Sequence, residues 1–187
     1  MKQVAIPFHS GAGHTERLAQ IIVDTMNDRI GFVAHLIRVE PLEQVDWARL
    51  QHADAIIFGS PTYMGNVSGP MKSFMDATGE IWLDQPWANK IGAGFTVGTS
   101  PSGDKLNSLI QMAVFAAQHG MVWVGQNQVG SKHGDDADAR INDGGSWLGL
   151  MAQSATDKAV LIPPHDVETA RLFAHRVADA VERWAQD

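Results

Sequence analysis

Three short segments of the sequence place glycine and hydroxyl side chains directly after an apolar run. They are residues 9–15 (HSGAGHT), 60–66 (SPTYMGN) and 99–104 (TSPSGD). Glycine lets the backbone turn so that several N–H groups face one point, and hydroxyl groups add further donors. We therefore expect these segments to carry the ligand-binding chemistry of the protein.

The first segment is suited to a phosphate because its pattern also opens a helix. A helix N-terminus adds about half a positive charge to the N–H donors of the loop. The segment is neither a Walker loop nor a Gly-x-Gly-x-x-Gly dinucleotide loop, because the required lysine and third glycine are missing. A glycine-rich turn with a hydroxyl that merely caps the helix is the alternative. The residues expected at the phosphate are Ser10, Gly11, Ala12, Gly13, His14 and Thr15.

The elements that must position these segments alternate along the chain. Apolar runs predict strands at residues 4–8, 32–39, 53–59, 90–98 and 121–124. The stretches between them carry apolar residues three and four positions apart, which is typical of amphipathic helices. Short links between alternating strands and helices indicate parallel strands with right-handed crossovers. The predicted fold is α/β: one domain, residues 1–187, with a doubly wound five-stranded parallel sheet and helices on both faces.

Four local features complete the predicted elements. Residues 60–66 are expected to be a loop, and Pro70 suits the first turn of the helix that follows. Residues 126–157 are rich in glycine and aspartate and predict an extended loop with short helical pieces. Asp166 is expected to cap the last helix.

Composition limits the classes of function. The chain has 187 residues, a net charge of −7 and no cysteine. The negative charge disfavours nucleic acid and anionic membranes as partners, and the missing cysteines exclude thiolate chemistry. No apolar run approaches the roughly 20 residues that span a bilayer, and no secretory signal is visible. We expect a cytoplasmic protein without a metal, and we interpret His133 and its acidic neighbours as a solvated loop.

The predicted sheet brings the three segments to one place. Each follows a strand, and ligands of doubly wound sheets bind beyond the carboxyl ends of the strands, where the strand order reverses. A common site is therefore better supported than a role for any one segment, for which a plain surface turn is the alternative.

At these positions the sequence resembles a known family. Ser10 and Thr15, separated by four residues after the first strand, are similar to the FMN-phosphate loop of flavodoxins and their enzyme relatives. Residues 59–66, with Asp76, Thr78, Gly79 and Trp82, resemble the flavin-ring loop of WrbA-type NAD(P)H:quinone oxidoreductases. Residues 99–104 and 119–122 resemble the next two segments of that family, in the same order. The resemblance implies a flavodoxin-like fold and an FMN cofactor.

The resemblance also implies roles for individual residues. It places the flavin against Pro61, Thr62, Tyr63, Met64, Gly65, Thr99, Ser100, Pro101, Ser102, Gly103 and Asp104. It implies that His119 faces the flavin as a catalytic residue and that Trp82 stacks on the substrate. The alternatives are a helix-capping role for His119 and a core or interface role for Trp82. The family's tyrosine near the substrate pocket has no counterpart in residues 126–143, which contain no aromatic residue.

Three functions are compatible with these features. The leading one is an FMN-dependent enzyme that takes hydride from NAD(P)H at flavin N5 and passes electrons to a quinone or similar flat acceptor, in turn, at one face. The alternatives are a flavodoxin-like electron carrier and a scaffold without flavin chemistry. The loops expected at the flavin edge are mostly uncharged, with the exception of Asp104, which favours the enzyme over the electron carrier. Tryptophans in or beside loops predict a homo-oligomer, a dimer or tetramer in which a neighbour completes the pocket.

Overall fold

A single mixed sheet with a parallel core forms the centre of the protein. The computed structural model describes residues 1–130, 140–157 and 159–184. The strand order is β2-β1-β3-β5-β6, and neighbours in this order run parallel. The bounds of these strands are β1 (Lys2–Phe8), β2 (Phe32–Arg38), β3 (Ala55–Tyr63), β5 (Ile91–Gly98) and β6 (Val122–Trp123). The order reverses between β1 and β3, which confirms the doubly wound α/β prediction.

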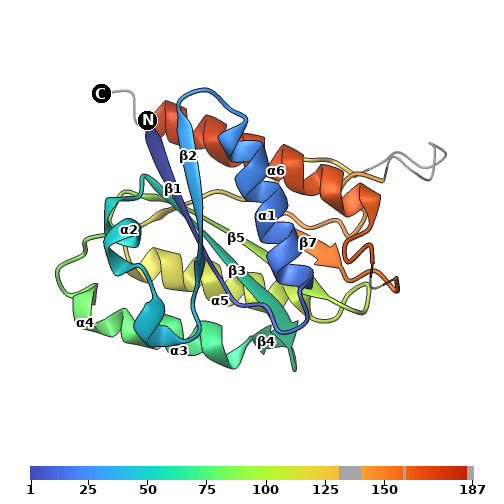
Figure 1. Cartoon of the computed structure of the whole chain (residues 1–187), viewed down its shortest axis with the longest axis horizontal. Helices are drawn as coiled ribbons and strands as arrows, with labels where there is room; N and C mark the ends of the chain where they lie inside the picture. Colours follow the sequence, from blue (N-terminus) through green and yellow to red (C-terminus); the bar gives the residue numbers. More distant parts are fainter. Residues whose placement is uncertain (131–139, 158, 185–187) are drawn as a thin grey trace.

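Helices cover both faces of the sheet (Figure 1). On one face α1 (His14–Asn27) lies beside α6 (Pro164–Trp184), and their apolar sides share a core with the strands. The other face is covered by α2 (Trp47–His52), α3 (Gly69–Ala77) and α5 (Lys105–Gln118). The short helices η1 (Leu42–Gln44) and α4 (Gly79–Trp82) flank this second layer. The three-layer architecture explains why the predicted strands are apolar throughout: both of their faces are buried.

Alternate residues of each strand belong to different cores. In β1, Val4, Ile6 and Phe8 pack in the layer of α1 and α6, whereas Ala5 packs in the layer of α5. This is the two-residue period of a strand, in which successive side chains point to opposite faces. The register then follows, with Phe8 paired to Arg38 on one side and to Gly59 on the other.

The predicted loop at residues 60–66 is a β-hairpin. Strand β3 continues to Tyr63, and the chain returns at once as β4 (Asn66–Val67), which pairs antiparallel with β3. The two turn residues, Met64 and Gly65, both have positive φ angles, 50° and 78°. Positive φ at both central positions is what a two-residue type I′ hairpin needs, and glycine at the second meets half of that need without strain. Methionine is not a residue typical of the first position of such a turn, so the sequence did not predict the hairpin.

Two short strands share the edge of β5. The predicted fifth strand is β6, which pairs with Ile91 and Gly92 of β5, and β7 (Leu150–Gln153) pairs with Phe95 to Gly98 of β5. The prediction of loop and short helical pieces at residues 126–157 is therefore wrong over β7. Four residues are too few to show a strand period, and only the unpaired edge of β5 gives them a partner. Gly149 precedes β7 because a Cβ there would lie 2.4 Å from the Gly94 carbonyl oxygen.

Two predictions near helix starts have different outcomes. Pro70 lies in the first turn of α3 as expected, where Ser68 caps the helix by accepting from the Met71 N–H. Asp166 lies inside the first turn of α6 rather than at its cap, and its Oδ2 accepts from the Gln153 N–H of β7 at 2.8 Å. His133 and its acidic neighbours lie outside the described residues. Among the helices that the structure describes, none is long and apolar enough to cross a membrane.

Candidate cofactor site

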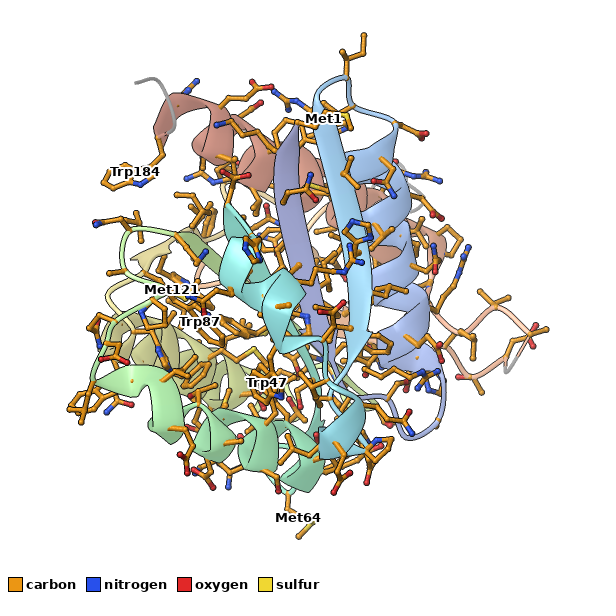
Figure 2. The ribbon with its side chains drawn as sticks, turned by 60° about the vertical axis from the view of Figure 1, so that its left-hand side comes forward. Met1, Trp47, Met64, Trp87, Met121 and Trp184 are labelled. Atoms are coloured by element: carbon orange, nitrogen blue, oxygen red, sulfur yellow. The ribbon has the colours of Figure 1, made fainter. Side chains whose placement is uncertain are left out.

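The three predicted loops meet at the carboxyl ends of β1, β3 and β5. They surround a cleft of about 190 Å³. Met1 and Met64 lie at opposite ends of the sheet, and Met64 points away from the protein at the tip of the β3–β4 turn (Figure 2). The cleft is lined by Gly11, Ala12, His14, Thr15, Pro61, Thr62, Tyr63, Val97, Gly98, Thr99 and Ser154. Folding thus brings together residues of all three predicted segments.

The first loop offers hydrogen-bond donors at the N-terminus of α1. Ser10 Oγ accepts from the Gly13 N–H at 3.1 Å, which closes the turn and leaves the hydroxyl hydrogen free to donate. Gly13 has a φ of 88°, in the left-handed region that favours glycine. The N–H groups of Gly11, Ala12, His14 and Thr15 form no hydrogen bond with any described residue. A set of free donors at a helix N-terminus matches the chemistry of a phosphate.

The first loop is also shaped by Tyr63. A Cβ on Gly11 would lie 2.4 Å from the Tyr63 hydroxyl oxygen, so this close approach requires a glycine. The Tyr63 ring is half-exposed and meets the edge of the His9 ring at a centroid distance of 6.4 Å. Tyr63 therefore connects the first and second loops at the mouth of the cleft.

Two hydroxyl side chains of the second loop, those of Ser60 and Thr62, are anchored toward the inside of the protein. Thr62 Oγ1 lies 2.7 Å from Thr96 Oγ1 and 2.8 Å from Ser108 Oγ. Ser60 Oγ accepts from the Ser68 N–H at 2.9 Å. These buried contacts hold the end of β3 rigidly beside the cleft.

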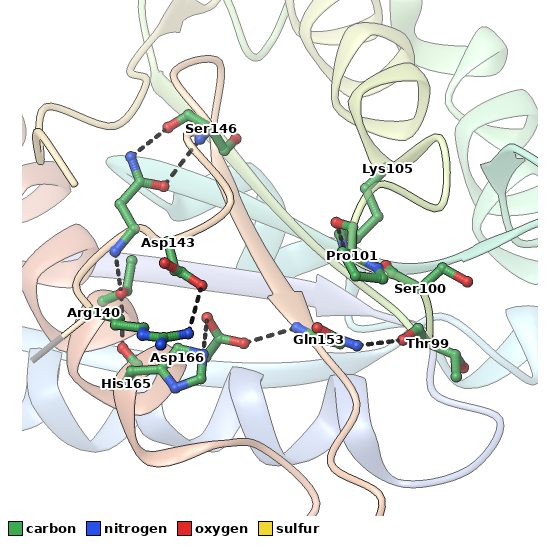
Figure 3. A network of polar contacts seen from close by, with 12 residues as sticks. Thr99, Ser100, Pro101, Lys105, Arg140, Asp143, Ser146, Gln153, His165 and Asp166 are labelled. Atoms are coloured by element: carbon green, nitrogen blue, oxygen red, sulfur yellow. Dashed lines mark hydrogen bonds and ion pairs between the residues drawn. The ribbon is translucent and has the colours of Figure 1, made fainter. Parts of the chain in front are cut away.

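The third loop is held by side chains of α5 and β7 (Figure 3). Lys105 Nζ donates to the carbonyl oxygens of Ser100 and Pro101 at 2.9 and 3.0 Å. Gln153 Nε2 donates to the Thr99 carbonyl oxygen at 2.7 Å. Asp104, the residue before α5, has a φ of 54° and makes no capping bond with its side chain. Strand β7 and helix α5 therefore determine the shape of this loop.

His9, beside the cleft, was not among the residues expected at the phosphate, and Ser154, in its lining, was not expected in the site. His9 directly follows β1, and its Nε2 lies 3.3 Å from a Glu40 carboxylate oxygen, whereas its buried Nδ1 has no partner among the described residues. Burial lowers the pKa of His9. Its place between β1 and the phosphate loop was the available signal. No sequence signal indicated Ser154, because only the pairing of β7 brings it to the cleft. There its Oγ donates to Thr99 Oγ1 at 3.3 Å.

His119 and Trp82 do not reach this cleft within one chain. His119 ends helix α5, which starts at the third loop and has 14 residues, a length of about 20 Å. It is buried, with Nε2 2.9 Å from Thr78 Oγ1 and its ring against Trp87 and Phe115. Burial lowers the pKa of His119. His119 therefore does not line the cleft of its own chain, and it lies at the helix end that the alternative described; that it faces a flavin stays a prediction.

Trp82 lies with His119 in a second cavity. This cavity, of about 490 Å³ between α3, α4 and α5, is lined by both residues and by Phe115 and Val114. Trp82 is 43% exposed, and its Nε1 donates to the Gln118 carbonyl oxygen at 2.8 Å. We call this the Trp82 cavity. It is separated from the cleft by the length of α5, so Trp82 and His119 do not share a cavity with the three loops.

The chain is similar to proteins of known name. Residues 9–136 match the model of the family "NADPH-dependent FMN reductase". The chain is 37% identical over 182 residues to flavodoxin FldP of Pseudomonas aeruginosa, which covers 95% of this chain and 96% of that protein. It is 30% identical over 204 residues to an NAD(P)H dehydrogenase (quinone) of Archaeoglobus fulgidus, covering 98% and 99% of the two chains.

A solved structure gives the same result. The flavodoxin, WrbA-like protein of Agrobacterium tumefaciens superposes with a TM-score of 0.77 at 33% identity, covering 98% of this chain and 99% of that one. The family model spans well over half of the chain. With the reversed strand order and the loops at its switch point, these similarities show that the chain is a flavodoxin-like, WrbA-type protein of the NADPH-dependent FMN reductase family.

Proposed function

We propose that the protein binds FMN in the cleft and transfers electrons from NAD(P)H to a quinone or similar flat acceptor. The free N–H groups of the first loop at the N-terminus of α1 carry the proposal. They provide a phosphate site at the switch point of the sheet. FMN would supply the two-electron hydride chemistry, for which no ionisable side chain is obligatory.

Different residues of the cleft bind different parts of FMN. Ser10, Thr15 and the N–H groups between them hold the phosphate. The backbone of residues 62–64 and the third loop, 99–104, contacts the flavin ring. The cleft volume, about 190 Å³, is below the roughly 300–1,000 Å³ of whole ligand pockets, so it accommodates only part of the cofactor. The flavin ring then lies toward the mouth, beside Tyr63, which leaves one face open to substrates.

The Trp82 cavity belongs to the proposal through a second copy of the chain. Trp82, Ile110 and Val114 expose 43%, 43% and 56% of their surface around this cavity. Contact with another copy would cover this apolar surface. We propose a dimer or tetramer in which the cavity of one copy faces the flavin of its neighbour, so that Trp82 stacks on the acceptor and His119 lines the same space.

An electron carrier is the second candidate function. The relative of 37% identity is named a flavodoxin, whereas several others are named NAD(P)H dehydrogenase (quinone). A carrier exchanges electrons with a partner protein and has no turnover of its own. The two candidates share the FMN site and differ in what approaches the flavin.

One experiment distinguishes the candidates. The purified protein is saturated with FMN, and NADH or NADPH is added with benzoquinone while absorbance at the flavin and nicotinamide bands is followed. Steady oxidation of NAD(P)H supports the enzyme. Flavin reduction that requires an added reductase protein supports the carrier, and failure to bind FMN contradicts both.

A further inference from the structure

Lys105 is a buried cation directly behind the cleft. It is the first residue of α5 and is only 3% exposed. A lysine is rarely buried to this degree, because removing an ammonium group from water is unfavourable unless it is paired. The first turn of a helix is also the end where the helix dipole disfavours a positive charge. Burial and the helix dipole therefore both disfavour the positive charge of Lys105.

The side chain packs against the wall of the cleft. A Cβ on Gly98 would lie 3.2 Å from Lys105 Cγ and Cδ and 4.0 Å from Nζ. Gly98 itself lines the cleft. Only the backbone of Gly98 therefore separates the ammonium group from the cleft on this side.

The ammonium group is satisfied by backbone rather than by a carboxylate. Its two hydrogen bonds go to Ser100 and Pro101 carbonyl oxygens. Within residues 1–130, 140–157 and 159–184, it forms no salt bridge. Burial lowers the pKa of Lys105 although the charge of Asp166 opposes this change, and burial raises the pKa of Asp166 above its ordinary value. The positive charge of Lys105 is thus not neutralised by contact.

The hydrogen bonds of Lys105 also orient the third loop. In a planar trans peptide, the carbonyl group and the following N–H point in opposite directions. Because the Pro101 carbonyl points to Nζ, the Ser102 N–H points away from it. Lys105 therefore determines which side of this loop presents its donors.

We propose that Lys105 positions the third loop and supplies a positive charge behind the cleft that favours the reduced form of the bound flavin. The proposal rests on the proposed binding of FMN. A hydride from NAD(P)H carries two electrons and one proton, so NAD(P)⁺ is released and the flavin gains one negative charge. A buried, unpaired cation nearby stabilises that charge more than it would in water.

Redox titration of the FMN-loaded protein tests this inference. Lys105→Met removes the charge and keeps the length of the side chain. Lys105→Gln removes the charge and retains an N–H donor for the loop carbonyls. We expect both to bind reduced FMN more weakly relative to oxidised FMN, by about tenfold. That ratio corresponds to a midpoint potential about 30 mV more negative for a two-electron couple.

Lys90→Met is the matched control. Lys90 is half-buried and, like Lys105, donates to two backbone carbonyls, those of Gln51 and Ala53, but it precedes β5 at the opposite end of the sheet. We expect its loss to lower the melting temperature and to leave the midpoint potential unchanged.

The outcomes separate charge from structure. A merely structural role would weaken both redox forms of FMN equally and leave the potential of both Lys105 variants at the wild-type value, which would overturn the inference while FMN binding stands. If Lys105→Met does not fold, Lys105→Gln decides in the same way. Wild-type protein that binds no FMN would overturn the proposed function and this inference with it.

Discussion

At the scale of single residues, the first loop depends on hydroxyl groups at both of its ends. Ser10 closes the turn by accepting from the Gly13 N–H, and Thr15 is buried in the lining of the cleft. Each is expected to donate to the phosphate a charge-assisted hydrogen bond of about 1.5–3 kcal/mol.

Replacing both hydroxyl residues tests the phosphate site. We expect Ser10→Ala with Thr15→Ala to weaken FMN binding by roughly 2–4 kcal/mol, since water compensates part of the two lost bonds. Fluorescence titration measures the loss, and riboflavin is the control because it lacks the phosphate. Riboflavin that binds the wild type as tightly as FMN does would contradict the phosphate site.

A single methyl group tests the contact between Gly11 and Tyr63. In Gly11→Ala the new Cβ would lie 2.4 Å from the Tyr63 hydroxyl, so the ring must turn away. Because this ring is half-exposed, we expect a small change in stability but at least a tenfold loss of FMN affinity, about 1.4 kcal/mol. Gly69→Ala is the control, since a Cβ there has no neighbour within 4 Å. Equal FMN affinity of the Gly11 variant and the control would remove Gly11 from the site.

At the scale of elements, β7 and the start of α6 hold the third loop. The Gln153 N–H donates to Asp166 Oδ2, and Gln153 Nε2 donates to the Thr99 carbonyl oxygen (Figure 3). Asp166 is buried, and burial raises its pKa in spite of the Gln153 hydrogen bond and the charges of His165 and Lys105. Because folding raises the pKa of this carboxyl group, the folded protein loses stability relative to the unfolded chain as pH rises above the ordinary pKa of 3.8.

Neutralising this carboxyl group should therefore not destabilise the fold at neutral pH. We expect Asp166→Asn, which keeps an acceptor for the Gln153 N–H, to melt at or above the wild-type temperature at pH 7. The gain should shrink as pH falls toward 4. Asp166→Ala should be less stable by about 1–3 kcal/mol, because the Gln153 N–H loses its partner. An Asn variant that is clearly less stable than wild type at pH 7 would show that the ionised carboxylate stabilises the fold.

At the scale of the whole molecule, the apolar rim of the Trp82 cavity predicts self-association. We expect light scattering to give a particle of two or four times 20.3 kDa. Val114→Glu, on the exposed rim of the cavity, should dissociate it and lower turnover while each chain still binds FMN. Ile30→Glu is the control, because Ile30 is 97% exposed in the turn before β2, away from this cavity. A stable particle of 20.3 kDa that remains active at every dilution would contradict the oligomer.

The same assembly gives Trp82 and His119 a measurable role. If a neighbour's flavin faces them, Trp82→Ala should chiefly raise the apparent KM, because stacking stabilises ground and transition states alike. His119→Ala should lower turnover per bound FMN. If both residues are only structural, both variants should melt at lower temperature and keep their activity per bound FMN. Thermal melts measured beside activity per bound FMN separate the two cases.

The sequence by itself determined the alternating strands and helices, and through them the convergence of the three loops. Apolar runs such as residues 4–8 and 90–98 are long enough to show that they are buried on both faces. Parallel connection then places every following loop at the same edge of the sheet. Local pattern and chain connectivity were sufficient for the parallel core of the fold and for the meeting of the three loops.

Only the tertiary structure decided which residues lie beside one another at long range. Strand β7 forms because the edge of β5 lacks a partner, and no pattern in four residues announces it. His119 is separated from the cleft because a helix of 14 residues carries it to the far end of the sheet, although its sequence segment follows the third loop. No sequence pattern marks Lys105 as buried, yet the carbonyl oxygens of Ser100 and Pro101 accept its hydrogen bonds inside the protein. Burial and pairing depend on contacts between distant segments, and the order of residues along one segment does not contain them.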